Sequence, residues 1–83
     1  MDEKLILNNG TELTGHLIES DRLFLYLYDI TLAEAFRMLD KPANTKVITW
    51  ERYGNTGTVE GYKHLKSISE EAGGMICASL TKE

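Results

Sequence analysis

The fold is decided by residues 4–28, which read KLILNNGTELTGHLIESDRLFLYLY. The Asn9-Gly10 pair supplies the positive φ angles that a tight two-residue turn requires, and it is the strongest short-range signal for a hairpin. Residues 4–7 and 11–18 flank this turn and have the composition of strands. We therefore predict an antiparallel β-hairpin at the beginning of the chain.

The two longer segments of this stretch alternate with the two-residue period of a β-strand. Leu13, Gly15 and Leu17 share one face of the first, and Gly15 should mark a bend or bulge because it has no side chain to pack. After a polar turn, residues 22–28 alternate leucine with aromatic residues, so both faces are apolar. Such a strand should lie centrally, with one side against the core and the other against a helix or a partner.

One short amphipathic helix should follow, from about Leu32 to Asp40. Thr31 and Glu34 have the spacing of a capping box, in which each side chain bonds the backbone amide of the other residue. Pro42 prevents the helix from continuing. The face expected to pack on the sheet has the i, i+3, i+4, i+7 spacing and consists of Leu32, Ala35, Phe36 and Leu39.

The rest of the chain has strand-like segments at about residues 46–53, at 58–62 continuing into 65–70, and at 75–81. Leu65 and Ile68 have opposite parity, so a bulge is expected between them. With 83 residues the chain holds a single domain, residues 1–83. The expected fold is α+β, with five or six short, mostly antiparallel strands in a curved sheet or partly open barrel, and one helix inserted after the third strand.

The bulk composition limits the partners and the compartment. Thirteen acidic residues against nine basic ones give a formal charge of −4, which makes nucleic acid an unlikely partner because such binding depends on clustered Lys and Arg. There is no apolar run long enough for a membrane span and no signal peptide. One cysteine cannot form an internal disulfide, as is typical of a reducing cytosol, so we expect a cytoplasmic protein.

No catalytic residue, metal site or cofactor is predicted. The possible metal ligands and nucleophiles besides carboxylates and serines are His16, His64 and Cys77, and no two of them lie close together in the sequence. The glycines at 54, 57 and 61 lack the following Lys-Ser or Lys-Thr of a phosphate-binding loop. The two histidines are expected on polar strand faces, and the cysteine as a small half-buried residue.

The aromatic residues are the best candidates for a contact surface, because Trp and Tyr are enriched at the energetically important centres of protein interfaces. In the alternative, they simply cover the sheet beneath the helix. The partner would be another protein or a second copy of this chain, and the oligomeric state is left open. The candidate contact residues are Tyr26, Tyr28, Trp50, Tyr53 and Tyr62.

Across most of its length the chain resembles small proteins that prophages and mobile elements of Gram-positive bacteria encode, often near tail or baseplate genes. The resemblance is carried by Asn9-Gly10-Thr11, by residues 31–36 and 40–48, by Tyr62 within Glu60-Gly61-Tyr62, and by the final strand at residues 76–80. It implies a non-enzymatic structural or interaction protein that contacts other phage proteins and is associated with the tail, baseplate or virion. It implies no catalytic residues.

A second, local resemblance covers residues 5–29, which are similar to the first motif of Sm-like RNA-binding proteins. Phe24, Leu25 and Tyr26 occupy the stretch where that motif has its base-reading Asn, and no Arg-Gly second motif follows. The resemblance implies a strongly bent strand at Gly15. It also gives the alternative function, RNA binding by a ring-forming small barrel.

Overall fold

In the computed structural model, residues 3–83 are described and form one seven-stranded sheet with two helices. The helices α1 (Leu32–Leu39) and α2 (Pro42–Thr45) follow one another between β3 and β4, and a 3-10 turn, η1 (Ala72–Gly74), precedes β7. The strands are β1 (Lys4–Ile6), β2 (Glu12–Glu19), β3 (Leu23–Tyr28), β4 (Val47–Arg52), β5 (Asn55–Glu60), β6 (His64–Glu70) and β7 (Ile76–Thr81).

The α+β class with a dominant antiparallel sheet is confirmed, but the strand count and the helical region were predicted wrongly. Seven strands form instead of five or six. β5 and β6, which are separated by only residues 61–63, lie at opposite edges of the sheet. The chain leaves β5 at Gly61, whose amide still donates to the carbonyl of Lys46, and then joins the other edge as β6. Two helices also stand where one was expected.

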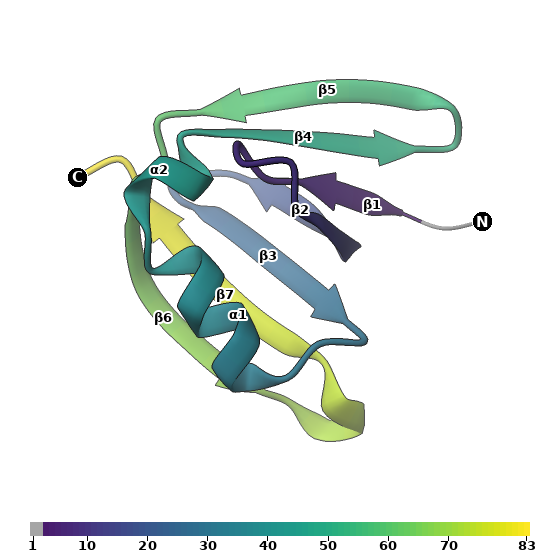
Figure 1. The fold of residues 1–83 in the computed structure, drawn as a ribbon, viewed down its shortest axis with the longest axis vertical. Coiled ribbons are helices and arrows are strands. Elements are labelled where there is room, and N and C mark those ends of the chain that lie inside the picture. The colour runs from purple at the N-terminus through teal and green to yellow at the C-terminus, as the bar shows by residue number, and fades with distance from the viewer. Residues whose placement is uncertain (1–2) are drawn as a thin grey trace.

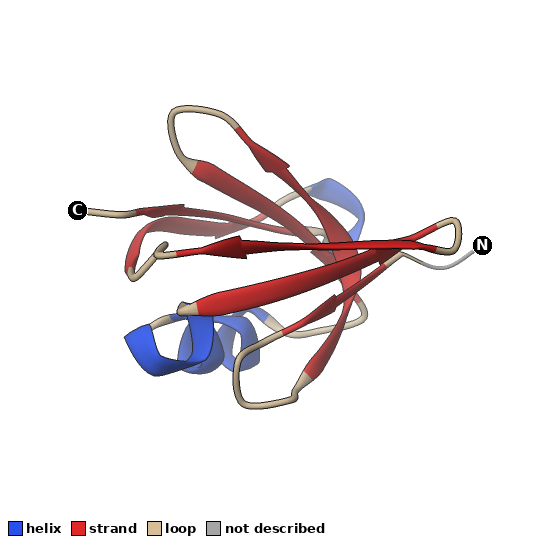
Figure 2. Cartoon of the chain, turned by 90° about the horizontal axis from the view of Figure 1, so that it is seen from above, coloured by secondary structure: helices blue, strands red, loops and turns tan. Residues whose placement is uncertain are grey.

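The sheet is open, with the strand order β5-β4-β1-β2-β3-β7-β6 and every pairing antiparallel. Its twist makes the β4–β5 hairpin run across the direction of β3 and β7 (Figure 1), and from above the strands fan out (Figure 2). β1 pairs with both β2 and β4, so that Lys4 lies opposite Thr14 on one side and Glu51 on the other.

The β1–β2 hairpin is confirmed, although its turn has three residues instead of two. The Leu7 amide donates to the Thr11 carbonyl and the Gly10 amide donates to the Leu7 carbonyl, both at 2.9 Å. Gly10 has a φ of 90°, the left-handed conformation that closes a three-residue hairpin loop. Asn8 then ties this turn to α2, because its amide donates to the Asn44 carbonyl.

Gly15 is required by the close approach of β2 to β3. The pairing runs in unbroken register through Gly15 and its partner Leu27, so the structure has no bulge there. A Cβ atom at this position would lie 2.1 Å from the carbonyl oxygen of Tyr26, and the φ of 153° is one that other residues rarely adopt. Only glycine allows the two backbones to meet here.

Helix α1 begins at the expected cap but presents a different face to the core. The Thr31 hydroxyl accepts the Glu34 amide at 3.1 Å, while the Glu34 carboxylate accepts that hydroxyl instead of the Thr31 amide. Ala35 and Leu39 are fully buried, whereas Phe36 is 46% exposed and Leu32 is also exposed. The prediction that Leu32 and Phe36 pack on the sheet is therefore wrong.

The difference comes from a rotation of the helix about its axis. At 100° per residue, Met38 and Phe36 lie on opposite sides of the Ala35–Leu39 line. Met38 packs against the core, so the buried stripe is turned toward Met38 and away from Phe36. Asn44 of α2 fixes this orientation, because its side-chain amide donates to the Met38 carbonyl at 3.0 Å.

The core lies between α1 and one face of the sheet. The three leucines of β3 are all buried on that face, as the alternation predicted, and they pair with Ile76, Ala78 and Leu80 of β7. The bulge expected between Leu65 and Ile68 is confirmed as a register shift between Leu65 and Ser67. The largest fully buried side chains are Leu5, Leu23, Leu25, Leu27, Leu39, Ile48, Thr45, Ile76 and Leu80.

Candidate functional site

The face of β2 and β3 that points away from the core carries an apolar and aromatic surface, which we call the outer face. It is defined by the side chains that alternate with the buried ones: Thr14, His16, Ile18, Phe24, Tyr26 and Tyr28. Ile18 is 51% exposed and Tyr28 is 42% exposed, while His16, Phe24 and Tyr26 are half-buried. Since α1 packs on the other side of the sheet, no helix of residues 3–83 covers these side chains.

His16 orders the rings of the outer face. It lies opposite Tyr26 in the β2–β3 pairing and stacks on its ring, with centroids 5.1 Å apart and planes 23° apart. The ring of Tyr28 is 6.4 Å away at a tilted angle. Stacked rings of this kind lose little side-chain entropy on binding, because their rotamers are already restricted.

The five aromatic residues proposed from the sequence do not form one surface. Tyr26 and Tyr28 lie on the outer face. Trp50 packs against the core from β4, and its ring covers Gly57 so closely that a Cβ there would lie 2.4 Å from the ring carbon Cζ2. Tyr53 is exposed just after β4, with the Arg52 guanidinium 5.7 Å from its ring centroid.

Tyr62 is a structural residue and not an exposed contact. It is 4% exposed, and its hydroxyl donates to Glu19 Oε2 at 2.6 Å. The hydrogen bond to Glu19, together with burial and the negative charge of the same carboxylate, raises the pKa of Tyr62 to about 12. The Lys82 ammonium lies 5.2 Å from the centre of the ring. Tyr62 thus anchors the chain as it crosses from β5 to β6.

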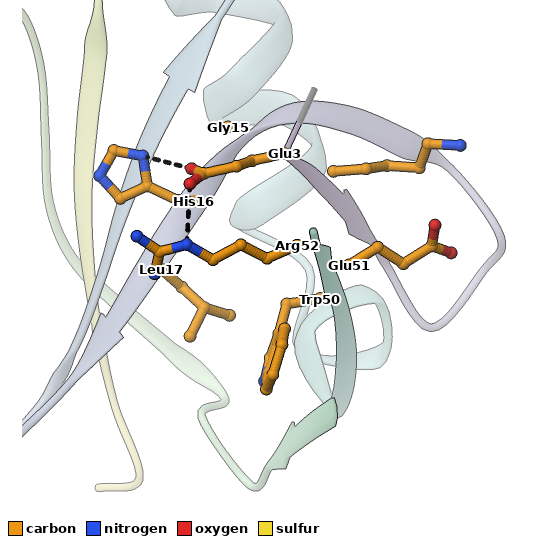
Figure 3. Close-up of a pocket in the computed structure, with 8 residues that line it drawn as sticks. Glu3, Gly15, His16, Leu17, Trp50, Glu51 and Arg52 are labelled. Atoms are coloured by element: carbon orange, nitrogen blue, oxygen red, sulfur yellow. Dashed lines mark ion pairs between the residues drawn. The ribbon is translucent and has the colours of Figure 1, made fainter. Parts of the chain in front are cut away.

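A pocket of about 230 Å³ lies where β2 and β4 extend past the end of β1. Among residues 3–83, β1 begins at Lys4, whereas β2 continues through Gly15 and β4 continues to Arg52, and the pocket lies between these two strands (Figure 3). The lining residues are Glu3, Lys4, Gly15, His16, Leu17, Trp50, Glu51 and Arg52.

The Glu3 carboxylate lies between the side chains of Arg52 and His16 at this pocket. Its Oε1 accepts the Arg52 Nε at 2.9 Å, and its Oε2 lies 3.1 Å from His16 Nδ1 (Figure 3). The carboxylate is therefore held between a guanidinium and an imidazole. His16 belongs to both the pocket and the outer face, so the two are continuous.

Sequence reasoning missed this pocket. It placed His16 on the strand face opposite Leu13 and Leu17, which is where the structure has it, but it did not connect His16 with Glu3 and Arg52. Glu3 and Arg52 meet only because β1 pairs with β4, two strands that are not consecutive in the chain. No local signal in the sequence indicates that pairing.

The structure also locates His16, His64 and Cys77, the possible metal ligands and nucleophiles of the sequence. Cys77 of β7 pairs with Tyr26, so β3 separates it from His16 on β2 by about 10 Å, two strand spacings. Burial and the nearby Glu71 raise the pKa of the Cys77 thiol, which disfavours the nucleophilic thiolate. His64 lies at the start of the edge strand β6. Within residues 3–83 no three His, Cys, Asp or Glu side chains are grouped to hold a metal ion.

No protein-family model matches this sequence, and comparisons with curated proteins and with solved structures find no match either. The likeness to prophage-encoded proteins therefore rests on the sequence elements quoted above. Residues 3–83 contain no helix with the length and apolar character that a membrane crossing requires.

Proposed function

We propose that this protein is a non-catalytic interaction domain that binds another protein through the outer face of β2 and β3. The observation that supports this is the outer face itself, whose exposed Ile18 and Tyr28 are covered by no helix within residues 3–83. Exposed aromatic and aliphatic side chains grouped on one face, with half-buried neighbours, are typical of the centre of a protein interface. His16 and Tyr26 add a stacked pair that is already ordered.

The partner in this proposal has a basic surface around an apolar centre. The chain carries a formal charge of −4, and long-range attraction therefore favours a positively charged protein over a second acidic copy. RNA is disfavoured for the same reason. Following the resemblance to prophage proteins, we propose that the partner is a phage structural protein, such as a tail or baseplate component.

The test measures binding of the purified chain to the products of the genes that flank its own, each produced separately and assayed by calorimetry. The double variant Ile18→Ser/Tyr28→Ser should weaken binding about tenfold or more, because two exposed anchors are lost. Phe36→Ser is the matched control, since Phe36 is about as exposed as Tyr28 but lies on α1, against the opposite face. Raising the salt concentration should reduce the association rate.

Three results would contradict the proposal. Equal weakening by the outer-face variant and by Phe36→Ser would mean that binding follows general apolar exposure. Binding of single-stranded RNA instead of any protein, lost at high salt, would favour the Sm-like alternative. Concentration-dependent dimers that the outer-face variant abolishes would make a second copy the occupant.

A further inference from the structure

The pocket beside the outer face has an apolar wall that is held in place. Trp50 and Leu17 are half-buried and pack against the core. These contacts keep both side chains from turning across the mouth of the pocket. Gly57 lies directly under the indole, with no room even for a methyl group between them. Gly15, which also lines the pocket, has no side chain to fill it.

The opposite side of the pocket is a seat for a carboxylate. Glu3 occupies it at present, bridging Arg52 Nε and His16 Nδ1. Arg52 contacts Glu3 through Nε, and a guanidinium has further N–H groups that can bind a second oxygen atom. Glu3 itself lies just before β1, so its side chain can turn away without disturbing the Lys4–Ile6 ladder.

The size of the pocket limits what can bind. Pockets for cofactors and drug-sized ligands have volumes of about 300–1,000 Å³. At about 230 Å³ and open to solvent on one side, this pocket is too small for a nucleotide and large enough for one aliphatic or aromatic group. A ligand that uses both sides therefore has one such group and one carboxylate.

We propose that this pocket binds a carboxylate attached to a single apolar group, with the apolar group against Trp50 and Leu17 and the carboxylate on Arg52 and His16 in place of Glu3. Two sources have this chemistry: a small free carboxylic acid, and the C-terminal residue of a peptide chain. The proposal does not depend on the partner that we assign to the outer face, because it concerns the pocket formed by β1, β2 and β4.

The emission of Trp50 reports on this pocket directly, because Trp50 is the single tryptophan of the chain. Phenylacetate is titrated against phenylacetamide, and a tripeptide that ends in leucine is titrated against its C-terminal amide. A ligand of this size should bind with a Kd on the order of 1 mM. The free acids should change the emission saturably, and the amides should not.

Variants of the seat make the test specific. Glu3→Gln should tighten binding several-fold, because it removes the internal carboxylate that competes with the ligand. Arg52→Gln should weaken binding about tenfold through the loss of charge-assisted hydrogen bonds. Glu60→Gln is the matched control, since Glu60 is an exposed carboxylate at the other end of the β4–β5 hairpin and does not line the pocket, so binding should be unchanged. Circular dichroism melts verify that each variant is folded.

Binding by the tripeptide alone would support the seat and assign it to a chain terminus, whereas binding by phenylacetate alone would assign it to a free acid. The proposal is overturned if amides bind as well as acids, if Glu3→Gln does not tighten binding, or if no saturable change occurs at about ten times the expected Kd. None of these outcomes depends on the outer-face variants, so the two proposals fail separately.

Discussion

Leu39→Ala should destabilise the domain far more than Phe36→Ala, although the two residues lie on the same helix. Leu39 is fully buried between α1 and the sheet, and truncation there leaves a cavity and removes buried carbon atoms from the core. Such changes cost about 2–5 kcal/mol. Phe36 is 46% exposed, so its truncation should cost less than about 1 kcal/mol.

These costs are large on the scale of a small domain, whose free energy of unfolding is about 5–15 kcal/mol. For a domain of this size each kcal/mol lowers the Tm by about 4–8 °C, so a loss of about 3 kcal/mol should lower it by about 12–24 °C. Calorimetric melts and urea titrations of both variants give the comparison. A larger loss for Phe36→Ala than for Leu39→Ala would refute the helix rotation and restore the face that the spacing predicted.

Two further predictions concern the sheet. Gly15→Ala should lower the free energy of unfolding by about 2–5 kcal/mol in urea titrations, because strain in φ adds to a clash with the Tyr26 carbonyl. Gly10→Ala should cost only the strain, about 1–3 kcal/mol, because nothing lies near its Cβ position. Equal losses in the two variants would show that a shift of the strands relieves the clash. The Tyr62 phenol, measured as the ultraviolet difference between the wild type and Tyr62→Phe, should ionise near pH 12, and Glu19→Gln should lower this midpoint. Because folding raises the pKa of Tyr62 from 10.0, its contribution to stability is complete below pH 10 and should be lost as the pH rises to about 12. An equal loss of unfolding free energy over this pH range in Tyr62→Phe would contradict this assignment.

The local features of the fold could be predicted because they depend on neighbouring residues. The Asn9-Gly10 hairpin, the buried leucines of β3 and the Thr31 cap each follow from a few adjacent positions. The rotation of α1 could not be predicted, since residues 32–39 offer apolar side chains on both sides of the Ala35–Leu39 line. The contacts with α2 and β6 select between them, and those contacts are set by the rest of the chain.

The same difference between features set by neighbouring residues and features set by distant residues holds for the candidate sites. The outer face was partly predictable, because the alternation in β3 places Tyr26 and Tyr28 on the same face. The burial of Tyr62 was not, because it depends on the crossing from β5 to β6 and on the hydrogen bond to Glu19. The pocket could not be predicted at all, because it exists only where one strand is shorter than the two strands beside it. Strand ends of this kind depend on pairing between distant segments. In our proposal, the residue just before β1 competes with the carboxylate that would bind in this pocket. That residue is Glu3. The Glu3→Gln variant therefore distinguishes a site that binds carboxylates from an ion pair that has no ligand.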